Sequence, residues 1–371
     1  MKNIIIILYF LLILNKAMNP KKIPNLPDKL KIGYASWGEC DEKIFESVQN
    51  GLNVIIWFSI DMSTNSDKTK PEFTRGPEYS EVAKMIKRFK DNNYQVINLI
   101  SIGGWNSIHP NVNFTADEYF KEWIEFNKRI SKPELDFYGF DGIDWDIEGN
   151  SKIDSSINHF TFEELDLMGK FSQILKKEGY IVSMAPAESY LDPTTDEFSL
   201  SLLHNYPEWE KEVPEFKYHG RNVYAYLLAK YSIDTFDFIS VQLYEGYSHT
   251  LYKYKKEKKQ FGNILYDLIT SLNEGYIVDF SKDKNSGMGK EVIKIPRDKI
   301  VIGLANGWAG DRFLFVDEKN IVEGWNYIKE KNKDVRGIMF WDIADEGLIP
   351  KDENSCDKKP FYMAKILNSL L

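Results

Sequence analysis

Three acidic residues, Asp144, Asp146 and Glu148, follow one another at intervals of two in the stretch 140–150. In an extended strand successive side chains alternate between faces, so all three carboxyl groups would point to the same side. Like charges held this close are costly unless protons are shared, and such sites often take part in chemistry. The residues between them are large and apolar and would be buried on the opposite face: Ile143, Trp145 and Ile147. The pattern predicts a buried strand with one acidic, reactive face.

Two other interpretations of the acidic row are an ordinary acidic strand end and a calcium-binding loop. A calcium loop needs oxygen ligands on a flexible turn, and its bulky apolar residues stand at other offsets.

Cleavage of a glycosidic bond needs an acid that delivers a proton to the leaving oxygen. Glu148 ends the row, and the neighbouring charge of Asp146 would raise its pKa. We therefore predict Glu148 to be a proton donor.

The spacing Asp-x-x-Asp-x-Asp-x-Glu, from Asp141 to Glu148, resembles the signature of glycoside hydrolase family 18, the chitinases and their relatives. Within that family the asparagine- and lysine-rich chain resembles the short protozoan chitinases. The resemblance implies hydrolysis of β-1,4 bonds between N-acetylglucosamine units, without a cofactor. It also implies that the N-acetyl oxygen of the sugar replaces an enzyme nucleophile, so that configuration is retained. Asp146 would then orient the acetamido group, and Asp144 would share charge or a proton with Asp146.

Further motifs match the family along the chain. Gly103-Gly104-Trp105 ends a segment that resembles the family's third-strand Ser-x-Gly-Gly motif, and Met184-Ala185-Pro186 resembles the fifth-strand motif. The resemblance implies that Gly104, Trp105 and Met184 line the sugar site. A core position for Trp105, and a strand simply ended by proline after Met184, are the alternatives.

Gln242-Leu243-Tyr244 resembles the sixth-strand Gln-x-Tyr motif, and its first and third residues share one face. The resemblance implies that the Tyr244 hydroxyl bonds the acetamido carbonyl as charge develops. Glu245 departs from the family, where many relatives have Asn or Asp. Trp341 resembles the tryptophan that forms the base of the family's central sugar subsite. Tyr34 is a weaker candidate for the same position. The alternative is that Trp341 is a tryptophan of the barrel core.

Eight short apolar runs alternate with eight longer amphipathic ones. This alternation predicts a parallel sheet with helical crossovers, closed as a (β/α)8 TIM barrel, an α/β fold. The candidate strands are 31–37, 53–59, 95–102, 139–146, 181–185, 238–244, 300–305 and 337–342. The candidate helices are 41–50, 79–92, 116–131, 161–178, 221–231, 261–274, 320–332 and 360–370. Long loops, at 61–77, 188–220 and 247–260, would shape a groove on the carboxyl-end face.

The amino-acid composition limits the kinds of molecule that this chain is expected to bind. The chain has 371 residues, close to one large barrel with insertions, and a net charge of −9. That charge disfavours nucleic acid, whereas a neutral polymer such as chitin or N-acetylglucosamine oligomers would not be repelled. The aromatic content of 14% suits sugar stacking but serves the core as well. The five histidines lack metal-ligand spacing, so we predict no metal, and we expect a monomer.

The N-terminus has the pattern of a secretory signal peptide. Lys2 precedes an unbroken apolar run, 4–14, that is too short to span a bilayer. We therefore predict a signal peptide at 1–19 and a catalytic domain at 20–371, without a separate chitin-binding domain. The mature protein is predicted to be secreted and to have no membrane contact after signal removal. An uncleaved anchor is the alternative.

Two cysteines, Cys40 and Cys356, follow the first and eighth candidate strands, which are neighbours in a closed barrel. A disulfide bridge on the shared rim is predicted, with two free thiols as the alternative. Asn113 begins the sequon Asn-Phe-Thr and is a glycosylation candidate.

We interpret the sequence as a secreted chitinase. Two rivals remain open. An endo-β-N-acetylglucosaminidase that cuts N-glycans would carry the same acidic row. A non-catalytic, chitin-binding lectin would keep the barrel, but such proteins commonly lose the proton donor, and Glu148 is present.

Overall fold

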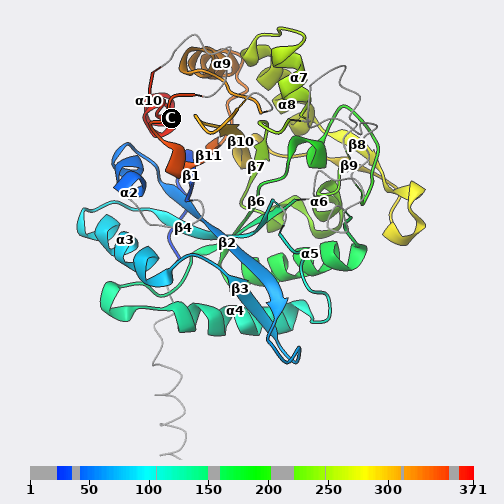
Figure 1. Cartoon of the computed structure of the whole chain (residues 1–371). Coiled ribbons are helices and arrows are strands. Elements are labelled where there is room, and N and C mark those ends of the chain that lie inside the picture. The colour runs from blue at the N-terminus through cyan, green and yellow to red at the C-terminus, as the bar shows by residue number, and fades with distance from the viewer. Residues whose placement is uncertain are drawn as a thin grey trace, which may run out of the picture.

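Eight parallel strands close into a barrel at the centre of the molecule (Figure 1). The structure is a computed structural model, and it describes residues 23–35, 42–105, 107–148, 159–201, 221–246, 248–310, 313–350 and 359–371. The barrel strands are β1 (Leu30–Ala35), β2 (Val54–Thr64), β4 (Ile97–Gly104), β5 (Gly142–Ile147), β6 (Ile181–Met184), β7 (Phe238–Gln242), β10 (Ile300–Ala305) and β11 (Gly337–Trp341). Their order is β1-β11-β10-β7-β6-β5-β4-β2, and a further pairing of β1 with β2 closes the ring. The predicted (β/α)8 barrel is confirmed.

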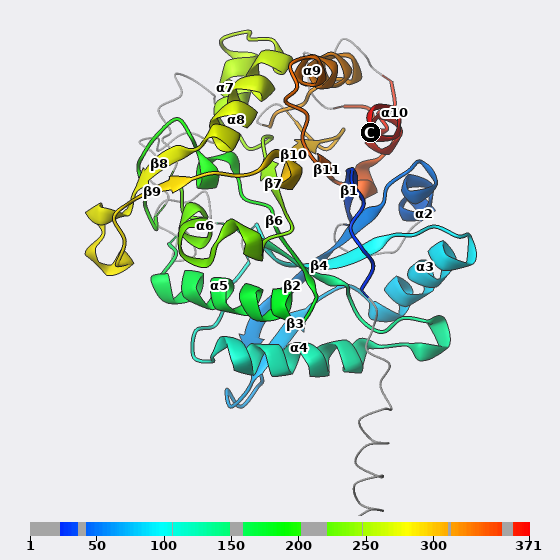
Figure 2. The same ribbon diagram turned by 180° about the vertical axis from the view of Figure 1, so that it is seen from behind.

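Helices surround the barrel, as the alternation of the sequence predicts (Figure 1 and Figure 2). They are α2 (Glu42–Gln49), α3 (Tyr79–Asp91), α4 (Ala116–Ile130), α5 (Phe162–Lys177), α6 (Ala225–Tyr231), α8 (Phe261–Glu274), α9 (Glu318–Glu330) and α10 (Met363–Leu370). The starts of α4 and α5 carry complete capping boxes, Thr115 with Glu118 and Thr161 with Glu164. None of the helices in the described ranges has the length and apolar character that a bilayer span requires.

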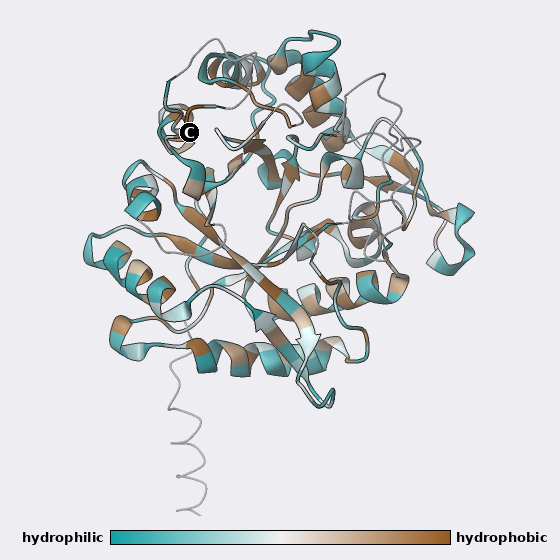
Figure 3. Cartoon of the chain, in the orientation of Figure 1, coloured by the Kyte–Doolittle hydropathy of each residue, from teal (hydrophilic) through white to brown (hydrophobic). Residues whose placement is uncertain are grey.

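The barrel wall separates two apolar layers, because alternate residues of each strand face opposite sides. The inner layer includes Leu30, Ile56, Leu99 and Met339. The outer layer packs strand residues such as Trp145 against the helices. Figure 3 shows hydrophobic residues concentrated along the strands and hydrophilic residues on the outer surfaces of the helices. Strands buried on both faces explain the continuous apolar runs of the sequence.

One helix and three strands lie in segments for which the sequence predicts no helix or strand. In segment 61–77, β2 continues to Thr64 and pairs antiparallel with β3 (Pro71–Arg75). Met62 pairs with Phe73 in this hairpin, and burial of both side chains explains why the segment is ordered. Segment 247–260 contains α7 (His249–Lys255), and a second hairpin joins β8 (Tyr276–Asp279) to β9 (Lys290–Ile293).

Two predictions lie outside the described residues. The signal peptide at 1–19 and the bridge between Cys40 and Cys356 both fall on segments that the structure does not describe. They remain predictions.

Candidate active site

The acidic row lies on β5 with its three side chains buried. Asp144 is fully buried, Asp146 is 4% exposed, and Glu148, just past the strand end, is 7% exposed. The intervening Ile143 and Trp145 pack in the outer layer against the helices. The strand therefore holds its apolar residues on one face and its acids on the other, as the spacing predicts.

Asp144 is held by two hydroxyl groups inside the barrel. The Tyr34 hydroxyl on β1 donates to Asp144 Oδ2 at 2.5 Å, and the Ser183 hydroxyl on β6 donates to Oδ1 at 2.5 Å. Burial raises the pKa of Asp144 to about 6, although both hydrogen bonds favour the ionised form. Tyr34 is thus a partner of the acidic row, and Ser183 is a site residue that the motifs did not indicate.

Asp146 and Glu148 lie close enough together for the protonation of each to affect the other. The Gln242 amide donates from Nε2 to Asp146 Oδ1 at 2.7 Å and to the Ala185 carbonyl at 2.6 Å. Burial raises the pKa of Asp146 well above its usual range, and the charges of Glu148 and Asp144 raise it further. Burial also raises the pKa of Glu148 to about 7. A carboxyl group with that pKa keeps a proton at near-neutral pH and can donate it.

The residues that follow β7 add a tyrosine and a fourth acid. Tyr244 and Glu245 are 5% and 6% exposed. Burial raises the pKa of both groups, and the charge of Glu148 adds to each shift. The predicted Tyr244 therefore lies near the acidic row, and so does Glu245, which the sequence marked only as a departure from the family.

Aromatic rings form a cluster beside Asp144. The ring of Trp341, at the end of β11, lies 5.0 Å from Phe58, 5.6 Å from Tyr34 and 6.5 Å from Trp308. Trp341 is only partly buried. Trp341 therefore lies beside Tyr34, the residue that holds Asp144, and its stacking on a sugar remains a prediction.

The end of β4 packs tightly against this group. Gly104 has φ +101, and a Cβ atom there would lie 2.0 Å from the ring of Phe58. Gly103 has φ +114, and a Cβ atom there would lie 2.6 Å from the Asp146 carbonyl oxygen. Glycine is therefore required at both positions. The absence of a side chain at Gly104 leaves room for the Phe58 ring.

Arg75 at the end of the β2–β3 hairpin braces the same strand end. Its Nη2 atom lies within hydrogen-bond distance of Ser59 Oγ at 2.7 Å, Asp61 Oδ1 at 2.8 Å, the Gly103 carbonyl at 2.7 Å and Ser107 Oγ at 3.0 Å. No sequence motif indicates this arginine, because the sequence predicts a loop where the hairpin lies.

The structure does not bring every predicted residue to the acids. Met184 pairs with Trp145 and packs in the outer layer, because its neighbour Ser183 takes the inward position on β6. Trp105 follows β4 and is 38% exposed, and Asn113 is exposed just before α4. Both side chains are accessible, and sugar contact by Trp105 and glycosylation of Asn113 remain predictions.

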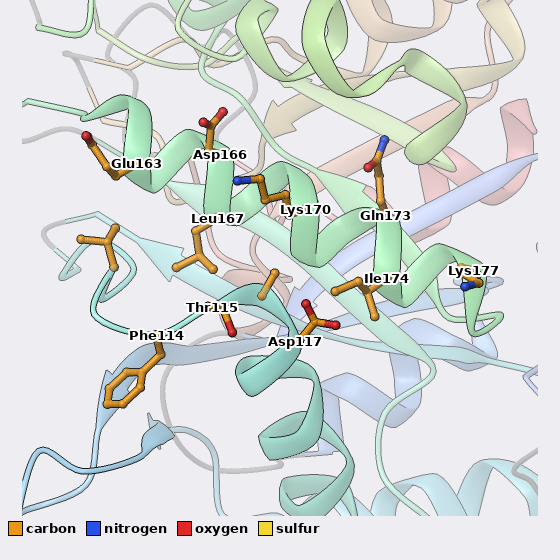
Figure 4. A pocket seen from close by; sticks show the side chains of 12 residues that line it. Phe114, Thr115, Asp117, Glu163, Asp166, Leu167, Lys170, Gln173, Ile174 and Lys177 are labelled. Atoms are coloured by element: carbon orange, nitrogen blue, oxygen red, sulfur yellow. The ribbon is translucent and has the colours of Figure 1, made fainter. Parts of the chain in front are cut away.

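A cleft of about 630 Å³ lies between α4 and α5, and none of its lining residues belongs to the acidic row (Figure 4). Leu167 and Ile174 supply apolar walls, and Asp117, Glu163 and Lys170 supply charged ones. Asp166 at this cleft already accepts hydrogen bonds from three side chains. In the described residues no cluster of His, Cys, Asp and Glu is arranged to hold a metal ion.

Solved structures share this architecture. A family 18 chitinase from Chromobacterium violaceum superimposes with a TM-score of 0.54 at 17% identity, covering 88% of this chain and 81% of its own. The chain shares the barrel fold of this chitinase. A fungal endo-β-N-acetylglucosaminidase of family 18 gives 0.53 at 14% identity, with coverages of 94% and 99%. Chitinase ChiC from Aspergillus fumigatus gives 0.52 at 14% identity, with coverages of 88% and 95%. No model of a known protein family and no curated protein sequence matches the chain.

Proposed function

We propose that this chain is a glycoside hydrolase that cleaves β-1,4 linkages between N-acetylglucosamine units of chitin with retention of configuration. The observation that carries the proposal is the buried acid pair Asp146 and Glu148 at the end of β5, in which burial raises the pKa of Glu148 to about 7. An acid that stays protonated at near-neutral pH is what departure of the sugar oxygen needs. The shared fold is consistent with this chemistry.

The reaction divides between the chain and the substrate. Glu148 gives its proton to the glycosidic oxygen as the bond to the anomeric carbon breaks. The acetamido oxygen of the same sugar forms the replacing bond, giving an oxazolinium ion. Asp146, whose raised pKa keeps it protonated, orients the acetamido group; as the oxazolinium ion forms, Asp146 would pass its proton to Asp144, so that the ionised Asp146 balances the positive charge. The ionised Glu148 then takes a proton from the water that opens the ring.

The remaining site residues hold the sugar. The Tyr244 hydroxyl would donate a hydrogen bond to the acetamido carbonyl, and Trp341 would stack on the sugar ring. Gln242, which already bonds Asp146, keeps that carboxyl in place. Trp105 would contact the sugar at a neighbouring subsite.

A second candidate is an endo-β-N-acetylglucosaminidase, which the fungal structure of that name favours as strongly as the chitinases do by fold. Both candidates use the same acid pair, so they differ only in the substrate outside the central subsite.

The test is product analysis on two substrates. We expect the purified protein to degrade a chitin hexamer to shorter oligomers whose new reducing ends are first the β-anomer by NMR. A high-mannose glycoprotein should release little glycan. Release of glycan with an intact hexamer would favour the second candidate, and initial α-anomer would contradict substrate assistance. Binding of the hexamer without products would favour a lectin.

We further propose that the chain is exported and acts as a monomer. The apolar segment after Lys2 supports export. Sequencing of the mature N-terminus should find it near residue 20, and light scattering should give the mass of one chain. An N-terminus at Met1 would contradict export, and twice that mass would contradict the monomer.

A further inference from the structure

We propose that Tyr224 is a positioning residue that fixes the backbone between the two acids, Asp146 and Glu148, by replacing a missing piece of the β5–β6 ladder. The inference rests on the proposed function, because it assigns a role within the same site. Tyr224 lies just before α6 and is 77 residues away from the strand that it contacts.

The contact involves both backbone groups of one residue. The Tyr224 hydroxyl accepts a hydrogen bond from the Ile147 N–H at 2.9 Å and donates one to the Ile147 carbonyl at 3.0 Å. The N–H belongs to the peptide unit shared with Asp146, and the carbonyl belongs to the unit shared with Glu148. One hydroxyl thus bridges the two peptide planes that carry the acid pair.

The bridge is needed because β6 leaves β5 too early. The ladder pairs Trp145 with Met184, and the Ala185 N–H donates to the Trp145 carbonyl at 2.8 Å. A regular parallel ladder would continue with the Ile147 N–H donating to the Ala185 carbonyl and the Ala187 N–H donating to the Ile147 carbonyl.

The segment that follows β6 pairs with β7 instead. The Ala185 carbonyl accepts from Gln242 Nε2 at 2.6 Å, the Gln242 N–H donates to the Pro186 carbonyl at 2.9 Å, and Ala187 forms a parallel bridge with Gln242. Ile147 is 1% exposed, so water would not readily replace the lost bonds. Buried backbone groups left unpaired are costly, and the Tyr224 hydroxyl satisfies both at once.

The ring of Tyr224 is itself held firmly. It is fully buried, its centroid lies 5.5 Å from that of Tyr190 and 6.3 Å from that of Phe160, and its N–H donates to the Tyr190 carbonyl at 3.2 Å. The packed ring therefore holds the hydroxyl in a fixed position, and the hydroxyl holds the Ile147 backbone at the end of the acidic row. Displacement of catalytic groups by about 1 Å can cost 100-fold in rate, so this constraint matters for turnover.

The experiment compares Tyr224→Phe with a matched control, Tyr119→Phe. Tyr119 on α4 is also fully buried, and its hydroxyl lies 3.0 Å from two backbone carbonyl oxygens, those of Ser63 and Asn111, outside the acidic site. Both substitutions keep the ring and delete one hydroxyl that holds backbone. Kinetics on chitin hexamer, the pH profile of kcat, and hydrogen exchange of the peptide spanning residues 142–148 are measured for each.

For Tyr224→Phe we expect about a tenfold lower kcat, a KM within about threefold, and a displaced alkaline limb of the pH profile. Exchange at 142–148 should become faster. Tyr119→Phe should keep kcat within about twofold and leave that peptide unchanged.

Two results would overturn the inference. One is unchanged exchange of the 142–148 peptide in Tyr224→Phe. The other is a kcat and pH profile that match those of Tyr119→Phe. The exchange measurement needs no substrate, so an inactive wild-type protein would reject the proposed function while the backbone bridge would still be tested.

Discussion

Two groups of buried carboxylates in this molecule differ in what surrounds them. Asp146 on β5 is 4% exposed and Asp192, beyond β6, is fully buried. Asp192 pairs with His249 Nε2 at 2.9 Å and accepts hydrogen bonds from the Thr194 N–H at 2.9 Å and hydroxyl at 2.7 Å. The partners of Asp146 in the described residues are an amide and other acids.

This difference decides whether burial or the neighbouring groups set the pKa of each carboxyl. Burial raises the pKa of both carboxyls, but at Asp192 the hydrogen bonds and the charge of His249 outweigh burial and lower it. At Asp146 the neighbouring carboxylates add to burial, and the pKa rises further. Burial with a cation gives a structural ion pair, and burial without one gives an acid that keeps its proton.

The largest expected effect is on turnover by Glu148→Gln. The variant cannot donate a proton, so kcat should fall by roughly 10²–10⁴-fold, while the Kd for a chitin oligomer stays within about threefold. Steady-state kinetics and titration calorimetry measure the two quantities.

Glu346→Gln is the matched control for that substitution. Glu346 is also 7% exposed, but it accepts hydrogen bonds from the start of α10 instead of facing the acid pair. It should keep kcat within about threefold. Equal losses in the two variants would remove the distinction between the proton donor and an ordinary buried acid.

The same Glu148→Gln variant should be more stable than the wild-type protein at about pH 8. The pKa of Glu148 is higher in the folded protein than in the unfolded chain. The free energy of unfolding therefore falls as pH rises from the unfolded pKa through about 7. Removing the buried carboxyl should add roughly 1–3 kcal/mol to the free energy of unfolding at that pH. Urea unfolding at about pH 5 and pH 8 measures the difference, and a loss of stability at the higher pH would contradict the account.

His249→Gln should have the opposite effect on stability. Burial alone would lower the pKa of His249, but Asp192 and Glu188 raise it above its usual value. The stabilisation is therefore present below the unfolded pKa of about 6.5 and is lost as pH rises through the folded value. The lowered pKa of Asp192 sets the acid limit, since its contribution is lost as pH falls.

We expect His249→Gln to cost about 1–2 kcal/mol near pH 5.5 and clearly less near pH 8.5. Urea unfolding at both pH values is the measurement. A cost that does not change with pH would show that packing, not the ion pair, accounts for it.

The smallest effect is expected for Tyr34→Phe, which deletes one hydrogen bond to Asp144. That bond favours the ionised carboxyl, so its loss should raise the pKa of Asp144 further and lower kcat by about two- to fivefold. Hexamer kinetics across pH would detect it, and an unchanged profile would leave Tyr34 with a packing role only.

The sequence predicts the barrel and the acidic row because both depend on local periodicity. Eight apolar runs and a two-residue spacing of acids need no knowledge of distant partners. Met184 illustrates the limit. The motif gives its strand correctly, but the facing of a strand depends on pairing, and the match of Asp144 with Ser183 turns Met184 outward.

Contacts between distant residues could not be predicted in this way. Tyr224 reaches Ile147 only because β6 turns away, and Asp192 meets His249 across two segments. The sequence predicts a loop in place of the β2–β3 hairpin, because the charged residues at its tip obscure the pairing of Met62 with Phe73. None of these contacts has a periodic signature along the chain.

The most direct test of the central claim is an infrared difference titration of the wild-type protein against Glu148→Gln. The account predicts a neutral carboxyl band assigned to Glu148 at about pH 6, which disappears with a midpoint near 7. A Glu148 that is already ionised at about pH 5 would contradict the account, because an acid without its proton cannot act as the donor.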